Sequence, residues 1–396
     1  MSDPSRARLR LGYPAAALVF AIGMLGTTLP TPLYGLYREE LGFSEFVVTV
    51  VFAVYAVGVI AVLLLAGNFS DQAGRRPVLL CALVLSAASA LCFLFEGGLP
   101  VLLVGRLLSG FSAGLFSGAA TVTVMEVAPR ADARRAGFAA TAANMGGLGC
   151  GPLVAGLLAQ YAPSPLTLPF LVDLGLIVVA ALLLWGLPET VRERRAPRLR
   201  PQGLTVPPEV RGVFAPAAVA GFAGFALLGL FTAVAPSFLA ETLHEHNLAT
   251  AGAVVFSVFL ASVAGQSLTD RIGARRTLPG GCFVLVAGLL LVASGLYWES
   301  LPLLVAGAVC GGLGQGLSFR AAVGALSAAA PAEHRGGTVS SFFVVAYLGI
   351  SLPVVGVGAL SLATGLRDAG LIFAACVVVL AVCVGLYVLR RPPRPA

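Results

Sequence analysis

Three charged residues stand within long apolar segments, where they could bind or carry an ion. Arg106, Asp173 and Arg320 are each flanked on both sides by runs of mostly apolar residues. A charge in hydrocarbon is costly, and such residues usually face a polar pathway or a partner. The carboxyl group of Asp173 could take up and release a proton, whereas the guanidinium groups could pair with an anion. Arg106 could instead extend to the membrane surface, and Asp173 could lie near water if its segment starts later.

The composition predicts that these residues lie in a membrane. Hydrophobic residues make up 58% of the 396-residue chain and charged residues 11%, with a mean hydropathy of +0.95. Soluble domains contain about 25% charged residues, so many membrane spans are a better explanation than one large core. All 25 basic residues are Arg, which favours a bacterial genome rich in G and C. The net charge of +7 comes mainly from Arg in short connections, so we expect no nucleic-acid partner.

Twelve segments are long and apolar enough to cross a bilayer as helices, which need about 20 residues each. The runs are continuous and do not alternate between apolar and polar residues, which excludes a strand barrel. The sequence therefore predicts an all-α membrane protein with spans at 13–37, 44–66, 77–96, 100–126, 136–161, 166–187, 213–240, 250–268, 277–298, 301–328, 337–362 and 369–389.

The distribution of Arg predicts the orientation and the division of the chain. Segments assigned to one side of the membrane hold 21 Arg, whereas the opposite side holds only Arg38 and Arg367. This bias predicts that both termini are cytoplasmic. The longest connection, 188–212, is rich in Pro and Arg and is expected to lie along the anionic inner leaflet. It divides the chain into a six-helix bundle at 1–187 and a second at 213–396, with a short basic tail.

A short polar motif occurs twice, with its two Asp residues 199 positions apart. Gly74 can adopt a positive φ at a turn, Asp71 can cap a helix or pair with Arg75, and the Arg residues hold the turn inside. An ordinary basic turn would explain one copy, but a repeat between membrane-length segments predicts a transporter with two similar halves. The first copy contains Gly67, Asp71, Gly74, Arg75 and Arg76; the second contains Gly265, Asp270, Arg271, Gly273, Arg275 and Arg276.

Two further patterns place glycine at helical spacing in spans 4 and 5. In span 4, Gly110, Gly114 and Gly118 follow Arg106 at four-residue intervals and allow close helix packing. Span 5 contains Gly147, Gly151, Pro152 and Gly156, where the proline interrupts the helical hydrogen bonds and the glycines permit a tight crossing.

Together these motifs resemble the major facilitator superfamily (MFS), and the resemblance covers the whole chain. It implies twelve helices in two pseudo-symmetric six-helix bundles. It also implies that the repeated loop latches the halves at the inner face, with Glu126 as the acidic partner of Asp71 and Arg75. The Arg106 pattern is similar to one linked in the family to proton coupling, and the span 5 pattern to that of its exporters. Gln72 and Ala155 depart from the family pattern, and span 1 lacks the acidic residue that many proton-coupled drug exporters have.

The sequence offers several polar residues for a substrate cavity, namely Tyr34, Asn144, Gln315 and Arg320. Residues such as Asn144 and Gln315 more often bridge neighbouring helices than contact a ligand, and Arg320 could either extend inwards to the membrane surface or meet an anionic group of the substrate. The seven Cys lack metal-ligand spacing, and His244 and His246 stand in a solvated loop, so we expect no disulfide, metal or cofactor.

The resemblance implies a secondary active transporter of the bacterial inner membrane that works by alternating access. We expect export of a small, mostly apolar drug or metabolite in exchange for protons, with Arg106 and Asp173 in the coupling. A monomer is expected to suffice. An uptake symporter or uniporter for a sugar or organic anion is the alternative, and the span 5 motif argues against uptake. A membrane enzyme or sensor is disfavoured because no catalytic cluster and no soluble signalling domain is evident.

Overall fold

The computed structural model describes residues 4–66, 69–95, 97–191, 204–331 and 333–390. Within these ranges, the side chains of residues 4–11, 130, 134, 270, 274 and 275 are not described. The described regular structure is helical throughout. Gly67, and residues 192–203 of the predicted linker, lie outside the described residues, so the boundaries at 187 and 213 stay a prediction.

The first half of the chain forms eight α-helices, which give six membrane spans. They are α1 (Pro4–Thr28), α2 (Tyr34–Leu41), α3 (Glu45–Leu65), α4 (Phe69–Ala73), α5 (Arg75–Leu94), α6 (Leu99–Val127), α7 (Ala133–Tyr161) and α8 (Leu168–Gly186). Helices α1 and α2 belong to the same span, and α4 lies outside the spans. Short 3-10 turns occur at Thr31–Leu33 and Arg130–Asp132.

The second half forms seven α-helices, again with six spans. They are α9 (Arg211–Gly229), α10 (Ala235–Ser237), α11 (Leu248–Ile272), α12 (Ala274–Tyr297), α13 (Leu301–Ala329), α14 (Arg335–Thr364) and α15 (Leu366–Arg390). A 3-10 turn at Pro208–Val210 precedes α9, and two π-helical segments, Leu230–Val234 and Phe238–Thr242, flank Pro236. A proline cannot donate a main-chain hydrogen bond, so a local change of helical pitch at this position is expected.

Twelve of the described helical stretches are long and apolar enough to span a bilayer, which confirms the predicted all-α membrane fold. Most span boundaries lie within four residues of the prediction, and the seventh span differs most, running from Pro208 to Thr242 rather than over 213–240. The first span runs from Gly12 to Leu41, and its α-helix is interrupted at residues 29–33, which contain Pro30 and Pro32. The eighth is longer than 250–268, because the polar residues up to Ile272 continue α11 as a helix.

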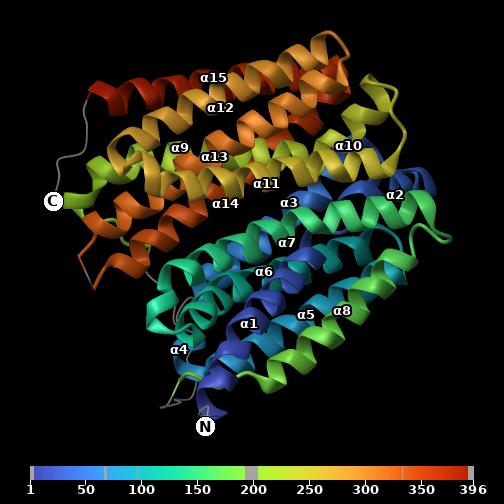
Figure 1. Cartoon of the computed structure of the whole chain (residues 1–396). Coiled ribbons are helices and arrows are strands. Elements are labelled where there is room, and N and C mark those ends of the chain that lie inside the picture. The colour runs from blue at the N-terminus through green and yellow to red at the C-terminus, as the bar shows by residue number, and fades with distance from the viewer. Residues whose placement is uncertain (1–3, 67–68, 96, 192–203, 332, 391–396) are drawn as a thin grey trace.

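The two halves lie side by side and touch along two helix pairs. Helix α7 packs against α11, and α3 packs against α14. In Figure 1 both described chain ends lie towards the left and lower edge, whereas α2 and α10 lie at the opposite edge. We call the end with the termini and α4 the terminal end, and the end with α2 and α10 the distal end.

Candidate functional site

A cavity of about 790 Å³ lies between the two halves. Its walls come from α1, α3, α6 and α7 of the first half and from α9, α11, α13 and α14 of the second. The lining extends from Arg106 to Met125, Arg135 and Arg271, which lie near helix ends at the terminal end. A cavity bounded by both halves is the arrangement that alternating access requires, because a movement between the halves changes which side it meets.

Arg106 is the charged residue at the deepest part of this lining. Its side chain is on α6, is only 2% exposed, and donates from Nη1 to the main-chain oxygen of Thr27 at 2.7 Å. Its guanidinium carbon lies 4.8 Å from the ring centre of Tyr55 and 5.6 Å from that of Phe52. The Nε atom has no hydrogen-bond partner, and no described carboxylate lies within 4.0 Å. Arg106 is thus a buried cation held by aromatic faces and one carbonyl, without a counter-charge.

Asp173 is equally buried but does not line the cavity. It lies on α8 and is 2% exposed. A methyl group placed at Gly26 of α1 would be 2.9 Å from the Asp173 Oδ2 atom and 3.1 Å from the Ser86 hydroxyl of α5. The Oδ1 atom has no hydrogen-bond partner. Asp173 lies against Gly26, and Arg106 binds the carbonyl of the next residue, Thr27. The two charged side chains therefore contact consecutive residues of α1 without touching each other.

The four predicted cavity residues divide into two pairs. Asn144 and Arg320 line the cavity, and the Asn144 Oδ1 atom is buried without a hydrogen-bond partner. Gln315 points instead at α11, where its Oε1 accepts from the Ser262 hydroxyl at 2.6 Å. Tyr34 is 3% exposed and belongs to an apolar cluster around α2, α3 and α5. Gln315 and Tyr34 are therefore not among the residues that line this cavity, because each side chain packs between helices.

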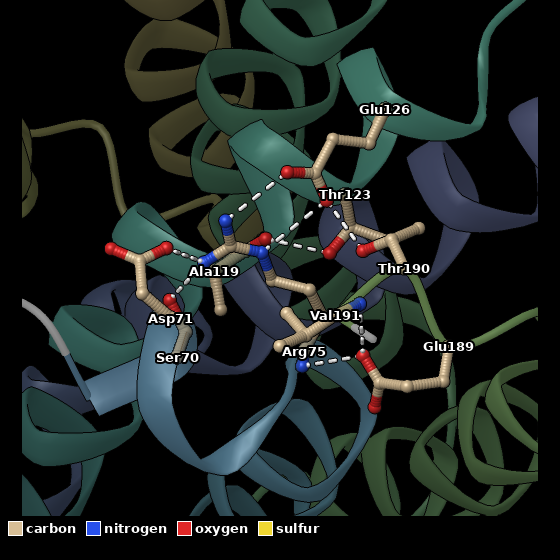
Figure 2. Close-up of polar contacts among 9 residues, drawn as sticks. All are labelled: Ser70, Asp71, Arg75, Ala119, Thr123, Glu126, Glu189, Thr190 and Val191. Carbon is tan, nitrogen blue, oxygen red and sulfur yellow. Dashed lines mark hydrogen bonds and ion pairs between the residues drawn. The ribbon is translucent and has the colours of Figure 1, made fainter. Parts of the chain in front are cut away.

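At the terminal end, Arg75 is the centre of a polar network (Figure 2). Its Nη1 contacts Asp71 Oδ1 and the Ser70 hydroxyl, each at 2.6 Å, and its Nη2 contacts Glu126 Oε1 at 3.1 Å. The Arg75 side chain is 8% exposed, whereas that of Asp71 is 59% exposed. Helices α4, α5 and α6 are therefore held together by one guanidinium group.

Two residues after α8, Glu189 and Thr190, complete this network, and no motif in the sequence predicts their role. The Thr190 hydroxyl donates to Glu126 Oε2 at 2.5 Å. The carboxylate of Glu189 accepts from the main-chain N–H groups of Arg75 and Arg76 at 2.9 and 3.2 Å, at the first turn of α5. A carboxylate there satisfies N–H groups that the helix cannot pair and meets the positive end of the helix dipole. Every member of the network in Figure 2 comes from the first half or from the segment that directly follows α8.

The second copy of the motif differs in local structure. Gly74 and Gly273 both have positive φ, 102° and 88°, as the turn prediction required of Gly74. Residues before Gly273, however, belong to α11, so the predicted loop is mostly helix, and Gly265 packs against the Leu313 carbonyl of α13. Arg271 lines the cavity and Arg276 is exposed. The side chains of Asp270 and Arg275 lie outside the described residues.

The glycine–proline motif of α7 contacts both α1 and α11. Pro152 cannot donate to the carbonyl of Leu148, and the Thr28 hydroxyl of α1 donates to that carbonyl instead, at 2.7 Å. A side chain at Gly151 would collide with Thr28. Gly147 lies equally close to α1, and Gly156 lies against the Leu248 carbonyl of α11. Helix α7 thus continues through Pro152, and its small residues bring it against a helix of each half.

At the distal end, polar contacts join the two halves. Arg38 of α2 bridges Glu45 at 2.8 Å and Glu241 of the second half at 2.5 Å. The Gln160 side chain of α7 accepts from the main-chain N–H of Leu248 at 2.9 Å. We call these contacts the distal seam. No pattern in the sequence predicts that Arg38 and Glu241 pair.

Comparisons with known proteins agree with this architecture. The family model of the Major Facilitator Superfamily matches residues 16–293 and 217–396, and so covers most of the chain. The chain belongs to the major facilitator superfamily. Members of the MFS are transporters and not enzymes, and the twelve spans make this chain a multi-pass bacterial membrane protein.

Relatives within the MFS are named for drug resistance. The chain is 31% identical over 166 residues to the tetracycline resistance protein, class B, of Escherichia coli, a match that covers 41% of this chain and 40% of that protein. It is 25% identical over 332 residues to the chloramphenicol resistance protein CraA of Acinetobacter baumannii, covering 79% and 77%. A solved structure of a bacterial homologue of the human lysosomal transporter Spinster aligns over the full length of both chains, with a TM-score of 0.72 and 17% identity.

Proposed function

We propose that this MFS protein exports a small, mostly apolar drug or metabolite in exchange for protons. The observation that carries the proposal is the cavity between the halves, which reaches the terminal end while the distal seam joins the halves at the other. The glycine–proline motif of α7 supports export, since it resembles that of exporters and packs at this seam. The names of the tetracycline and chloramphenicol relatives favour the same direction.

The orientation follows from the Arg distribution, which favours a cytoplasmic terminal end. The cavity then meets the cytoplasm in this state, and substrate enters from there. Opening of the distal seam with closure of the terminal end would release it on the other side. Both cavity walls come from one chain, so a monomer is sufficient.

Proton coupling is assigned to the two buried charges on either side of α1. Protonation of Asp173 neutralises a carboxylate packed against Gly26, and Arg106 holds the carbonyl of the next residue. A change of charge at Asp173 therefore alters the position of α1, which forms part of the cavity wall through Thr28. The network around Arg75 is the proposed latch: closure of the terminal end brings the exposed Asp71 carboxylate towards the second half.

The experiment uses the purified protein in liposomes with an imposed pH gradient. Chloramphenicol or tetracycline is the probe, and movement against its own gradient is measured. We expect accumulation on the acidic side, abolished by a protonophore and by Asp173→Asn. Arg367→Gln, which removes a charge at the distal surface, serves as the control with unchanged movement. Substrate movement that is indifferent to the pH gradient would rule out antiport.

Uptake of an organic anion is the second candidate, and the Arg residues of the cavity lining favour it. Cells that express the protein would then accumulate more substrate than cells with the empty vector. An exporter has the opposite effect, so the accumulation measurement separates the two directions.

A further inference from the structure

We propose that the substrate is a lipophilic organic anion, with an aromatic body and one carboxylate-like group that binds Arg106. The inference rests on the proposed function only in taking this cavity as the transport site. It does not depend on the direction of transport or on coupling to protons.

The described charged residues that line the cavity are all positive. Four Arg residues belong to its lining, and no Asp or Glu is among the lining residues that the structure describes. Arg135 and Arg271 lie near the terminal end, one on each half, and Arg320 lies on α13 within its last ten residues. A concave surface lined by one sign of charge attracts the opposite sign and repels its own. An anion is therefore favoured at the entrance and along the wall, whereas a cation is not.

Arg106 is a buried cation whose hydrogen-bonding groups are only partly satisfied. A buried charge is stable only when it is paired and its hydrogen-bonding groups are satisfied. Arg106 has one carbonyl and two aromatic faces, and its Nε atom lacks a partner. A carboxylate is the group that a guanidinium binds best, because two parallel N–H groups meet two oxygen atoms. A substrate carboxylate would supply the counter-charge that no described side chain provides.

The part of the cavity wall that the second half contributes is aromatic. Phe225, Phe319, Phe343 and Tyr347 of the second half all line the cavity. Their ring centres form a continuous series, with Phe225 at 5.6 Å from Phe319 and 5.8 Å from Tyr347, and Phe319 at 5.9 Å from Phe343. The Tyr347 ring lies 6.4 Å from that of Tyr55, the residue beneath Arg106.

An amphipathic ligand fits both walls at once. Its ring system would pack on the aromatic residues of the second half, in the offset or edge-on geometries that aromatic rings prefer. Its anionic group would then lie at Arg106. The unpartnered Oδ1 atom of Asn144, which also lines the cavity, could accept a hydrogen bond from a hydroxyl or amide of the same ligand.

The test compares three compounds of one shape that differ only in charge. Anthracene-2-carboxylate, anthracene-2-carboxamide and anthracen-2-ylmethylammonium are titrated into the purified protein, and the dissociation constants are measured by calorimetry. A charge-assisted contact with a buried guanidinium predicts that the carboxylate binds about tenfold more tightly than the amide. The ammonium compound is expected to bind more weakly than the amide. Equal affinities for carboxylate and amide, or tighter binding of the ammonium compound, would overturn the inference.

Two variants locate the effect. In Arg106→Gln, the preference for carboxylate over amide is expected to disappear while the affinity for the amide is retained. Arg367→Gln removes the same charge from the distal surface, outside the cavity lining, and should leave all three affinities unchanged. A carboxylate preference that persists in Arg106→Gln would overturn the assignment to this residue. If that variant does not fold, the wild-type series still decides the charge class.

The outcome is separable from the proposed function. A carboxylate preference together with transport that ignores the pH gradient would remove proton antiport and leave the substrate class standing. Proton-driven export of the ammonium compound, without binding of the carboxylate, would do the reverse.

Discussion

Helices α6 and α13 are the fourth span of each half, and both are 29 residues long. Three glycines recur in them at the same offset of 202 positions: Gly105, Gly110 and Gly114 in α6 and Gly307, Gly312 and Gly316 in α13. A side chain at Gly110 would collide with the Tyr55 carbonyl of α3, and one at Gly312 would collide with the Val258 carbonyl of α11. The same helix crossing is therefore made twice by the same residue type.

The two helices differ at the position of the buried charge, which is Arg106 in α6. The position equivalent to Arg106 is Ala308, which is completely buried. The repeated loop shows a similar difference, because Gly74 and Gly273 both have positive φ but are followed by Arg75 and Ala274 respectively. Glycine therefore specifies helix packing in both halves. At the two positions compared, the first half has a buried Arg (Arg106 and Arg75), whereas the second half has Ala (Ala308 and Ala274). The following changes would break or sharpen that comparison.

The largest effect on folding is expected at Gly110 and Gly312, the glycines that form the same helix crossing in both halves. Gly110→Leu and Gly312→Leu each force a side chain into a neighbouring main-chain carbonyl, so both variants should fail to give folded protein. Gly118→Ala is the control, since no atom lies within 4 Å of its added methyl group, and a helical Gly→Ala change adds up to about 1 kcal/mol of stability. Size-exclusion profiles and thermal unfolding measure the result. Normal folding of either Leu variant would contradict the shared-crossing argument.

The next largest effect is expected from two variants that exchange the residue types of Arg106 and Ala308 between the halves. Ala308→Arg buries a cation that has no partner, and we expect a loss of about 3–5 kcal/mol in the free energy of unfolding. Arg106→Ala makes the first half resemble the second; it should keep the protein folded but abolish transport in the liposome assay. Chemical denaturation in detergent measures the first change. A stable Ala308→Arg protein would show that the second half tolerates charge equally well.

A smaller effect is expected at the loop. Arg75→Ala creates the residue of the second copy and leaves Glu126 and Ser70 without their partner, at a cost of about 1–3 kcal/mol. Asp71→Asn removes only a carboxylate that is 59% exposed, so stability should change by less than about 1 kcal/mol. Transport rate should fall in both variants, because the proposed latch is weakened. A larger loss of stability in Asp71→Asn than in Arg75→Ala would contradict this order.

The smallest effect is expected at the distal seam. Arg38→Gln removes the ion pair to Glu241 between the halves, which is partly exposed and worth about 1 kcal/mol at most. The population with an open distal end should therefore rise by about fivefold or less. Distances between spin labels on α2 and α11 report the change. Arg367→Gln is the matched control, because Arg367 pairs with Glu299 inside the second half. An equal shift in both variants would contradict a role for Arg38 in closure.

Much of the fold follows from sequence pattern because hydrocarbon permits few alternatives. The number of spans was predicted from apolar runs, and the positive φ of Gly74 from the turn. The end of α11 was placed too early, since its last turn contains Thr269, Asp270 and Arg271 and gives no apolar signal. The orientation of Gln315 was also not predictable. A helix that is apolar on all sides does not reveal which face a single polar residue occupies.

The contacts between distant segments were the hardest to anticipate. Arg38 and Glu241 are 203 positions apart and follow no shared periodicity. Glu189 caps α5 from a segment that the sequence presents only as the start of a linker. The donation from Thr28 to Leu148 could be inferred only in part, because Pro152 shows that a carbonyl loses its partner but not which residue replaces it.

Three consecutive residues of α1 meet three different helices. Gly26 contacts Asp173 of α8, the Thr27 carbonyl accepts from Arg106 of α6, and the Thr28 hydroxyl donates to Leu148 of α7. A substitution at Gly26 or Thr28 disturbs a contact that holds α1 against another helix of the first half, whereas a substitution in the aromatic wall changes the surface that a ligand meets. Mutational freedom is therefore distributed unevenly: new substrate ranges can evolve through the aromatic residues of the second half, while residues 26–28 remain constrained whichever molecule is carried.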